Sequence, residues 1–192
     1  MLQKLRSNDT LIVDSHQALL SAYNDLATTS TANFHKRSGK ISFKEIQPRG
    51  NTFLDKTDAI FRKLRPFVIT SHVNVRKDAT YSPQVVRIDH FIERFSISET
   101  GVSRPKIIEC VGTDGNVYKQ LVKGGDDTRQ DAVMQQVFEH VNTIFSQQEV
   151  TRTRRLSVRT YKVLPLTPQT GVIEWVKNTI PFGTYLTSGK TK

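Results

Sequence analysis

Several features are scarce in this 192-residue sequence, and each absence excludes a class of protein. The only cysteine, Cys110, excludes an internal disulfide framework and is typical of a reducing compartment. No stretch approaches the ~18 consecutive apolar residues that a transmembrane helix needs. The amino-terminal residues MLQKLRSNDT lack the apolar core of a secretory signal peptide. We therefore expect a nuclear or cytosolic protein that does not bind a membrane.

The sequence also lacks the commoner constellations of catalytic and metal-binding residues. No Gly-x-Ser-x-Gly nucleophile elbow is present, and no Ser/His/Asp grouping is evident. The histidines show no metal-ligand spacing with Cys110 or with one another: His16, His35, His72, His90 and His140. We therefore expect no metal site within this chain.

Acidic residues are few, which gives 28 Lys and Arg against 18 Asp and Glu and a net charge of +10. A basic surface attracts nucleic acid, nucleotide phosphates or acidic substrates. One alternative is therefore a non-catalytic, basic, nucleic-acid-binding module. A basic run at 152–159 fits a solvated connection between a helix and a strand. Its segment Arg154-Arg155-Leu156-Ser157 resembles a target of basophilic kinases, but a position leading into a strand predicts poor accessibility of the serine.

Apolar periodicity divides the chain into a helical first third and a mixed remainder. Residues 11–26 and 52–64 each carry an apolar stripe at helical spacing, and Pro66 ends the second. A Ser/Thr-rich loop separates them. We expect helices of a preceding region in residues 1–66.

From residue 67 the pattern changes to short strands around one long helix. Asp114-Gly115 favours a tight hairpin turn. The strands are expected at 67–75, 85–91, 107–111, 116–123, within 151–166 and at 171–176, and the helix at 129–148. This order predicts an α+β fold with a small antiparallel sheet and one long helix.

The segment LVKGGDDTRQDAVMQQVF at 121–138 carries the chemistry. Lys123 ends a strand, and the two glycines that follow let the chain turn sharply. Asp126 and Asp131 lie near the start of the helix. A strand lysine held by such carboxylates presents its ammonium group to a phosphate. The same residues also suit a surface turn before an acidic helix start, because the helix dipole favours negative charge there.

Three motifs that occur together favour the phosphate-binding interpretation over the surface turn. They are residues 121–138, RPKIIECVGTDG at 104–115 and RTYKVLPLTPQTGVIEW at 159–175. Together they resemble the phosphatidylinositol 3-kinase-related protein kinases, and most closely the ATM-type branch. The resemblance covers about residues 85–186, and Thr128 stands where the family usually has leucine. It implies that residues 67–192 form a kinase-like N-lobe. Residues 1–66 would then be the end of a FAT-like helical region plus a linker.

The resemblance also implies roles for individual residues around ATP. Lys123 matches the lysine that contacts the phosphates, and Asp126 the acidic residue that pairs with it. Asp131 would line the inner pocket, with Tyr161 at its back. The loop from Ser98 to Arg104, which includes Thr100 and Gly101, matches the loop that covers the phosphates.

The hinge of the family matches Ile173, Glu174, Trp175 and Val176. The indole of Trp175 would pack on the adenine, and the backbone of Val176 would hydrogen-bond its edge. By their strand positions alone, Trp175 and Tyr161 also suit ordinary packing residues.

The implied function is a nuclear serine/threonine protein kinase of DNA-damage and telomere signalling. It would use ATP with Mg²⁺ and phosphorylate Ser/Thr-Gln sites. A DNA-break sensor complex would be its partner, and the parent enzyme would be a homodimer. A phosphoinositide lipid kinase would share Lys123, the Arg-Gln-Asp element and the hinge, and is the second alternative. The catalytic and metal-binding elements D-R-H-x-x-N and D-x-G do not occur in the sequence. We therefore expect a fragment without its C-lobe, with no catalytic residue, no Mg²⁺ ligands and no activity alone.

Overall fold

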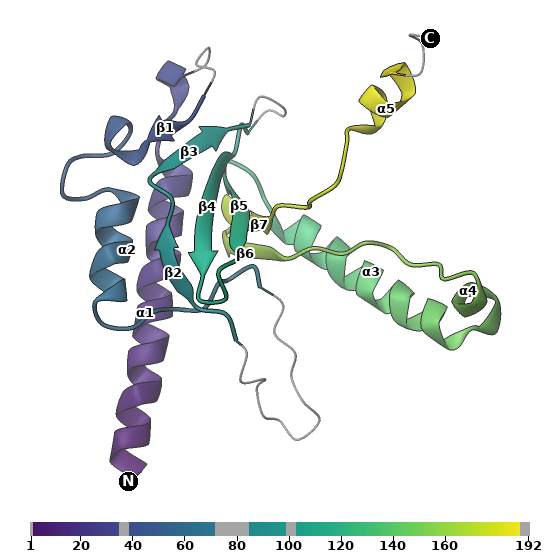
Figure 1. The fold of residues 1–192 in the computed structure, drawn as a ribbon, viewed down its shortest axis with the longest axis horizontal. Coiled ribbons are helices and arrows are strands. Elements are labelled where there is room, and N and C mark those ends of the chain that lie inside the picture. The colour runs from purple at the N-terminus through teal and green to yellow at the C-terminus, as the bar shows by residue number, and fades with distance from the viewer. Residues whose placement is uncertain (1, 35–38, 72–84, 99–102, 189–192) are drawn as a thin grey trace.

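The computed structural model of the chain describes residues 2–34, 39–71, 85–98 and 103–188. Its centre is a seven-stranded antiparallel sheet with the order β1-β3-β4-β5-β7-β6, and β2 pairs with β4 (Figure 1). The strands are β1 Ile41–Ser42, β2 Ile88–Phe91, β3 Arg94–Ile97, β4 Lys106–Gly112, β5 Val117–Gly124, β6 Val163–Thr167 and β7 Thr170–Glu174. The α-helices are α1 Leu2–Thr28, α2 Phe53–Phe61, α3 Arg129–Gln147, α4 Glu149–Thr153 and α5 Phe182–Ser188. Short 3-10 turns span Ala32–Phe34 and Phe43–Glu45. The α+β fold with a small antiparallel sheet and one long helix is confirmed.

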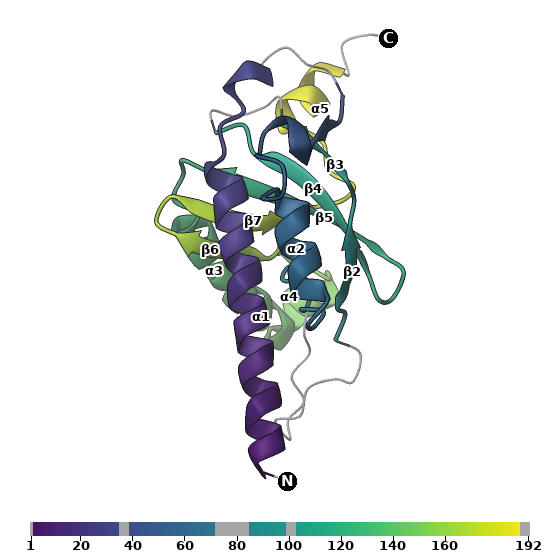
Figure 2. The same cartoon turned by 90° about the vertical axis from the view of Figure 1, so that its left-hand side faces the viewer.

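Helices α1 and α2 cover one face of the sheet, as the side view shows (Figure 2). Alternation along β5 turns Gln120 and Val122 toward α1, and both side chains are fully buried. An aromatic cluster centred on Phe53 fills the space between the helices and the strands. Residues from the first third and from the sheet therefore share a single hydrophobic core.

A buried hydrogen-bonded chain crosses this core. The Tyr23 hydroxyl on α1 donates to the Gln120 Oε1 atom at 2.5 Å, and the Gln120 Nε2 atom donates to the Thr70 hydroxyl at 2.9 Å. Burial raises the pKa of Tyr23 well above its ordinary value, so the phenol stays a donor. These bonds satisfy the amide that β5 turns into the core, which an apolar neighbour would leave unpaired.

Most expected elements are found, with one clear error. The stripes at 11–26 and 52–64 fall on α1 and α2, and the hairpin turn has Gly115 at φ +77°. The strand expected at 67–75 is wrong for residues 67–71, where Phe67 forms only an isolated bridge with Arg87. The chain then turns at once, because the Ser71 N–H donates to the Val68 carbonyl. Residues 72–75 lie outside the described residues. Alternating hydrophobicity cannot detect such a turn.

Helix α3 begins and ends close to the expected positions, but its apolar stripe does not reach the core. The helix leads away from the sheet (Figure 1), and Val133, Val137 and Ile144 remain about half exposed. Among α3 residues, only Gln135 is buried. Periodicity fixes which residues share a helix face, but not whether another element covers that face.

The expected division at residue 66 stays a prediction. Leu19 and Leu26 of α1 pack in the same cluster as Ile108, Val122 and Val172 of the sheet.

None of the helices among the described residues has the length and apolar character that a membrane span requires.

Candidate nucleotide-binding site

Lys123 lies near the end of β5, on the face opposite the α1-facing side chain of Val122. Its ammonium nitrogen is 2.5 Å from the Asp126 Oδ2 atom and 4.0 Å from the Asp131 Oδ2 atom. The hydrogen bond from Lys123 lowers the pKa of Asp126, so this carboxyl is ionised at neutral pH. The three residues predicted from the motif thus form one cluster of a cation held by two anions. The Lys123 side chain is 20% exposed, so its ammonium group is partly desolvated.

The two glycines after Lys123 play different roles, which corrects the sequence interpretation. Gly125 has φ +73° and makes the turn. Gly124 is still part of β5, where it pairs with Thr170. A Cβ atom at Gly124 would lie 2.3 Å from the carbonyl oxygen of Ala27. Gly124 is needed because the last turn of α1 presses against this strand.

The end of α1 also receives a buried lysine. The Lys106 ammonium donates to the same Ala27 carbonyl at 3.2 Å, and the residue as a whole is 5% exposed. A cation at a helix C-terminus is favourable, because the last carbonyls carry partial negative charge. Burial lowers the pKa of Lys106 to about 8. The first strand residue after the expected phosphate loop is therefore bonded to the helix that supports Gly124.

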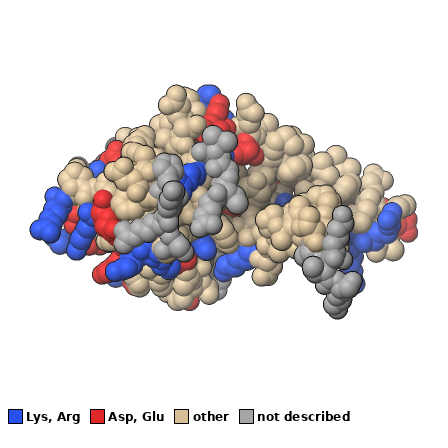
Figure 3. Space-filling view, turned by 90° about the horizontal axis from the view of Figure 1, so that it is seen from above, with Lys and Arg blue, Asp and Glu red and all other residues tan. Residues whose placement is uncertain are grey.

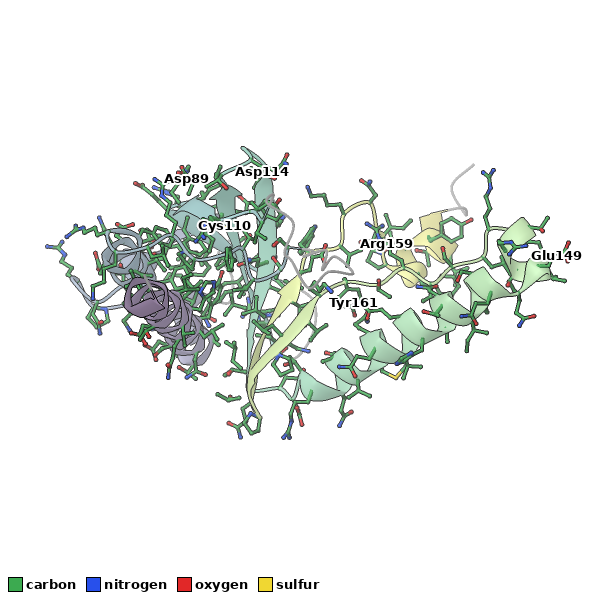
Figure 4. The ribbon with its side chains drawn as sticks, turned by 90° about the horizontal axis from the view of Figure 1, so that it is seen from below. Asp89, Cys110, Asp114, Glu149, Arg159 and Tyr161 are labelled. Atoms are coloured by element: carbon green, nitrogen blue, oxygen red, sulfur yellow. The ribbon has the colours of Figure 1, made fainter. Side chains whose placement is uncertain are left out.

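Tyr161 lies on the segment that returns along α3 to β6 (Figure 4). Its N–H donates to the Oε1 atom of Gln135, the buried residue of α3, at 3.1 Å. The side chain of Tyr161 is partly buried. The helix that carries Asp131 thus also positions Tyr161.

The expected hinge follows β7. Ile173 pairs with Leu121 and Val163 on the neighbouring strands. The Glu174 carboxylate accepts the Lys162 N–H at 2.9 Å. No acceptor for the Val176 N–H lies in the part of the chain that the structure describes. This donor is thus free for the edge of a base.

Trp175 has one face already occupied. The backbone N–H of Trp175 donates to the Lys119 carbonyl, and the Lys119 ammonium lies 4.2 Å from the centre of the indole ring. This cation–π contact leaves only the opposite face for an adenine. Sequence reasoning missed Lys119, although alternation along β5 places it on the same face as Lys123.

A cavity of about 410 Å³ opens beside Trp175, and Lys119, Arg159, Glu174 and Lys177 are among its lining residues. Lys123 lies outside it, further along β5. The predicted residues are therefore grouped at two places beside β5, a lysine–carboxylate cluster and an indole-lined cavity. Strand β5 joins them, so a ligand with an aromatic and an anionic end could touch both.

The remaining expected residues contribute less. Thr100 and Gly101 lie outside the described residues. Arg104 has φ +40°, at the end of the loop between β3 and β4. Among the described residues, no group of three His, Cys, Asp or Glu side chains gathers in a way that suits a metal ion.

Thr128, the departure from the family pattern, is fully buried at the start of α3. Its hydroxyl is the one buried side-chain oxygen or nitrogen without a hydrogen-bond partner among the described residues. A Cβ atom at Gly171 would lie 2.1 Å from this hydroxyl, so strand β7 passes directly beside it. The site therefore carries the desolvation cost of an unpaired hydroxyl.

We predict that Thr128→Val raises the free energy of unfolding by about 1 kcal/mol, because a methyl group of the same shape replaces the unpaired hydroxyl. Urea unfolding followed by circular dichroism measures the change. Thr57→Val is the matched control, since buried Thr57 donates its hydroxyl hydrogen to the Leu54 carbonyl. The control should lower stability. A loss of stability in both variants would show that the unpaired Thr128 hydroxyl does not lower the free energy of unfolding.

Known proteins match this chain in both sequence and structure. The family described as phosphatidylinositol 3- and 4-kinase matches residues 117–190. The serine/threonine-protein kinase tel1 of Schizosaccharomyces pombe is 43% identical over 171 residues, 88% of this chain. The serine-protein kinase ATM of Sus scrofa is 38% identical over 188 residues, 97% of this chain.

A solved structure described as the FAT and kinase domain of CtTel1 superposes with a TM-score of 0.79 at 39% identity. It covers 91% of this chain, which in turn covers 12% of that one. The chain spans about 6% of the length of the two curated relatives. By its kinase-like sheet, its strand lysine and these matches, the chain is homologous to the phosphatidylinositol 3-kinase-related kinases of the Tel1/ATM type.

Proposed function

We propose that this chain supplies the ATP-binding half of a serine/threonine protein kinase. The observation that carries the proposal is the Lys123 ammonium held between Asp126 and Asp131 at the end of β5. The named activity of the relatives supports it, since they are serine or serine/threonine protein kinases. The geometry alone would equally suit a phosphoinositide kinase. The preference for a protein substrate comes from the names of the relatives.

In this proposal each residue binds or orients ATP. Lys123 exchanges part of its contact with Asp126 for a phosphate oxygen, and Asp131 keeps the Lys123 side chain extended. The free face of Trp175 packs on the adenine, and the Val176 N–H donates to the edge of the base. Thr100, Gly101 and Arg104 belong to the loop that closes over the phosphates. Mg²⁺ would neutralise phosphate charge, and in this proposal its ligands lie on the C-lobe of the kinase rather than on this chain.

The wider role is a proposal of the same kind. It comprises phosphorylation of Ser/Thr-Gln sites in DNA-damage and telomere signalling in the nucleus, with a DNA-break sensor complex as activator and a homodimeric parent. A related solved structure is described as a complete CtTel1 dimer with C2 symmetry. The 192 residues contain neither D-R-H-x-x-N nor D-x-G, so we propose that they do not transfer phosphate alone. Faster phosphorylation of a Ser-Gln peptide than of its Ser-Ala counterpart, by a protein carrying this segment, tests the specificity.

The alternative of a nucleic-acid-binding module has less support. Figure 3 shows basic side chains mixed with acidic ones on the face seen from above, rather than gathered into one stripe. The pairs Lys56–Asp25 and Arg129–Asp127 show the same mixing. A net positive charge alone does not create a nucleic-acid groove.

Trp175 is the only tryptophan, so its fluorescence reports directly on the expected adenine site. We predict that ATP changes this fluorescence in a saturable way. Lys123→Ala should weaken binding about tenfold or more, which corresponds to one lost charge-assisted contact. Calorimetric titration with ATP gives the affinity independently.

Lys44→Ala is the control, because Lys44 is exposed in the 3-10 turn Phe43–Glu45. It should bind ATP as the unmodified chain does. Equal ATP affinity in Lys123→Ala and the unmodified chain, or no binding by a folded sample, would remove the proposal.

A further inference from the structure

The far end of α3 carries a basic, exposed turn. Helix α4 ends at Thr153, and the chain reverses at Arg155, which has φ +52°. Figure 4 shows the return segment running back beside α3, from the tip marked by Glu149, past Arg159 and Tyr161. Ser157 lies on this segment, ahead of β6, and is exposed. The poor accessibility predicted from the sequence is therefore wrong.

Ser157 has an arrangement of neighbours that no other hydroxyl in the sequence shares. It is the only Ser or Thr with arginine both three and two residues before it, at Arg154 and Arg155, and Arg152 precedes these. Guanidinium groups form paired hydrogen bonds with carboxylates, so arginines at fixed offsets suit an acidic substrate groove. The pattern thus specifies one class of modifying enzyme.

These arginines are also free to be recognised. Arg152, Arg154 and Arg155 are exposed. None of the three forms an ion pair with a carboxylate in the described part of the chain. A kinase that binds them does not have to break an existing salt bridge first.

The backbone around Ser157 is suited to a substrate groove. Residues 156–162 belong to no helix or strand, so no ladder of hydrogen bonds has to open. The residue after Ser157 is held by a side chain: Asn142 of α3 bonds both the N–H and the carbonyl of Val158, at 2.7 Å each. This clamp presents Ser157 at a defined place on the outer surface, and further along the segment the N–H groups of Tyr161 and Lys162 bond to Gln135 and Glu174.

We propose that Ser157 is a phosphorylation site for a basophilic serine/threonine protein kinase. The Ser157 Oγ atom attacks the γ-phosphorus of ATP bound to that kinase, and the bond from this phosphorus to the β,γ-bridging oxygen breaks. ADP leaves, and the hydroxyl proton passes to a base of the modifying kinase. The chain gains a phosphoserine next to the Asn142 clamp, on the segment that leads to Arg159 of the Trp175 cavity.

The added group changes the local charge strongly. A phosphate brings about −1.5 to −2 charges at neutral pH. It would stand among Arg152, Arg154, Arg155 and Arg159, which are otherwise a cluster of one sign. Arginine–phosphate pairs would order this turn, so modification is expected to stiffen the path between α4 and the cavity.

The test uses the catalytic subunit of the cyclic-AMP-dependent protein kinase with labelled ATP on the whole 192-residue chain. We expect about one phosphate per chain, assigned to Ser157 by peptide mass spectrometry and lost in Ser157→Ala. Removing both arginines in an Arg154→Ala/Arg155→Ala variant should lower kcat/KM for phosphorylation at least about tenfold. An Arg62→Ala/Lys63→Ala variant is the matched control, since that exposed basic pair follows α2. The control should be phosphorylated at the normal rate.

Three outcomes overturn the proposal. The first is equal phosphate incorporation in Ser157→Ala, and the second is an unchanged rate after both arginines are removed. The third is a folded chain that takes up no phosphate while the Arg154→Ala/Arg155→Ala variant loses salt-dependent affinity for a DNA duplex. The basic turn would then contact nucleic acid. Neither outcome bears on ATP binding at Lys123, which is measured separately.

Discussion

Replacing Gly124 by alanine is expected to lower the free energy of unfolding by about 3 kcal/mol. The new Cβ atom would lie 2.3 Å from the carbonyl oxygen of Ala27 and 3.0 Å from its carbonyl carbon. Both are backbone atoms of α1, so no side-chain rotation relieves the clash. Either α1 moves away from β5, or β5 shifts and carries Lys123 with it.

The displacement would also break a second contact. The same Ala27 carbonyl accepts the hydrogen bond from buried Lys106, so moving α1 leaves this ammonium without its acceptor. Urea unfolding followed by circular dichroism gives the loss of stability. At a urea concentration where the variant is still folded, ATP affinity shows whether Lys123 has moved.

Gly183→Ala is the matched control for this change. Gly183 lies in α5, and a Cβ atom there meets nothing within 4 Å. Alanine is the better helix former, so the control should be neutral or slightly stabilising. If Gly124→Ala and Gly183→Ala had the same stability, α1 would not press on β5 as the structure describes.

Phe53→Ala is expected to cost about 3–5 kcal/mol, the range for deleting a fully buried aromatic side chain. The Phe53 ring centre lies 4.8 Å from that of Phe91, and 5.3 Å from those of both Tyr23 and Phe43. It joins α1, the 3-10 turn and β2 around α2. The cavity left behind would be lined by three other rings. Close packing around these rings prevents them from moving in to fill it.

The same urea titration measures this loss. Phe182→Ala provides the comparison, because Phe182 is 73% exposed and should change stability by no more than about 0.5 kcal/mol. A Phe53→Ala variant as stable as Phe182→Ala would mean that α2 is not packed on the sheet. Both variants leave Lys123 and Trp175 unchanged.

The two predictions concern residues on opposite sides of the assigned boundary at residue 66. Gly124 needs α1 for its role, and Phe53 needs β2 and α1. The described residues before this boundary therefore belong to the same unit as the sheet. They contribute strand β1, cover one face with α1 and α2, and set the position of the strand that carries Lys123.

Local pattern was sufficient where one segment decides its own structure. The helical stripe at 129–148 predicts α3 because side-chain period and helix pitch agree. The pair Asp114-Gly115 predicts the hairpin because Gly115 adopts a positive φ without strain. The motif at 121–138 predicts that Lys123 lies near Asp126 and Asp131, since only a short turn separates them.

Contacts between distant segments were beyond such reasoning. Gly124 was explained as a turn residue, because the sequence does not show Ala27 beside it. Lys119 has no local sign that it will cover one face of Trp175. Val133 and Val137 look like core residues by spacing, although both remain about half exposed among the described residues.

The sequence by itself determined the fold class, the family and the lysine–carboxylate cluster, because these depend on short-range spacing and on ordered motifs. Tertiary structure alone decided three other things: the close approach of α1 to Gly124, the exposure of Ser157 and the occupied face of Trp175. The physical reason is that packing depends on which segments meet across large sequence separations. Identical local patterns are compatible with many arrangements of tertiary contacts, and only the shared core selects one.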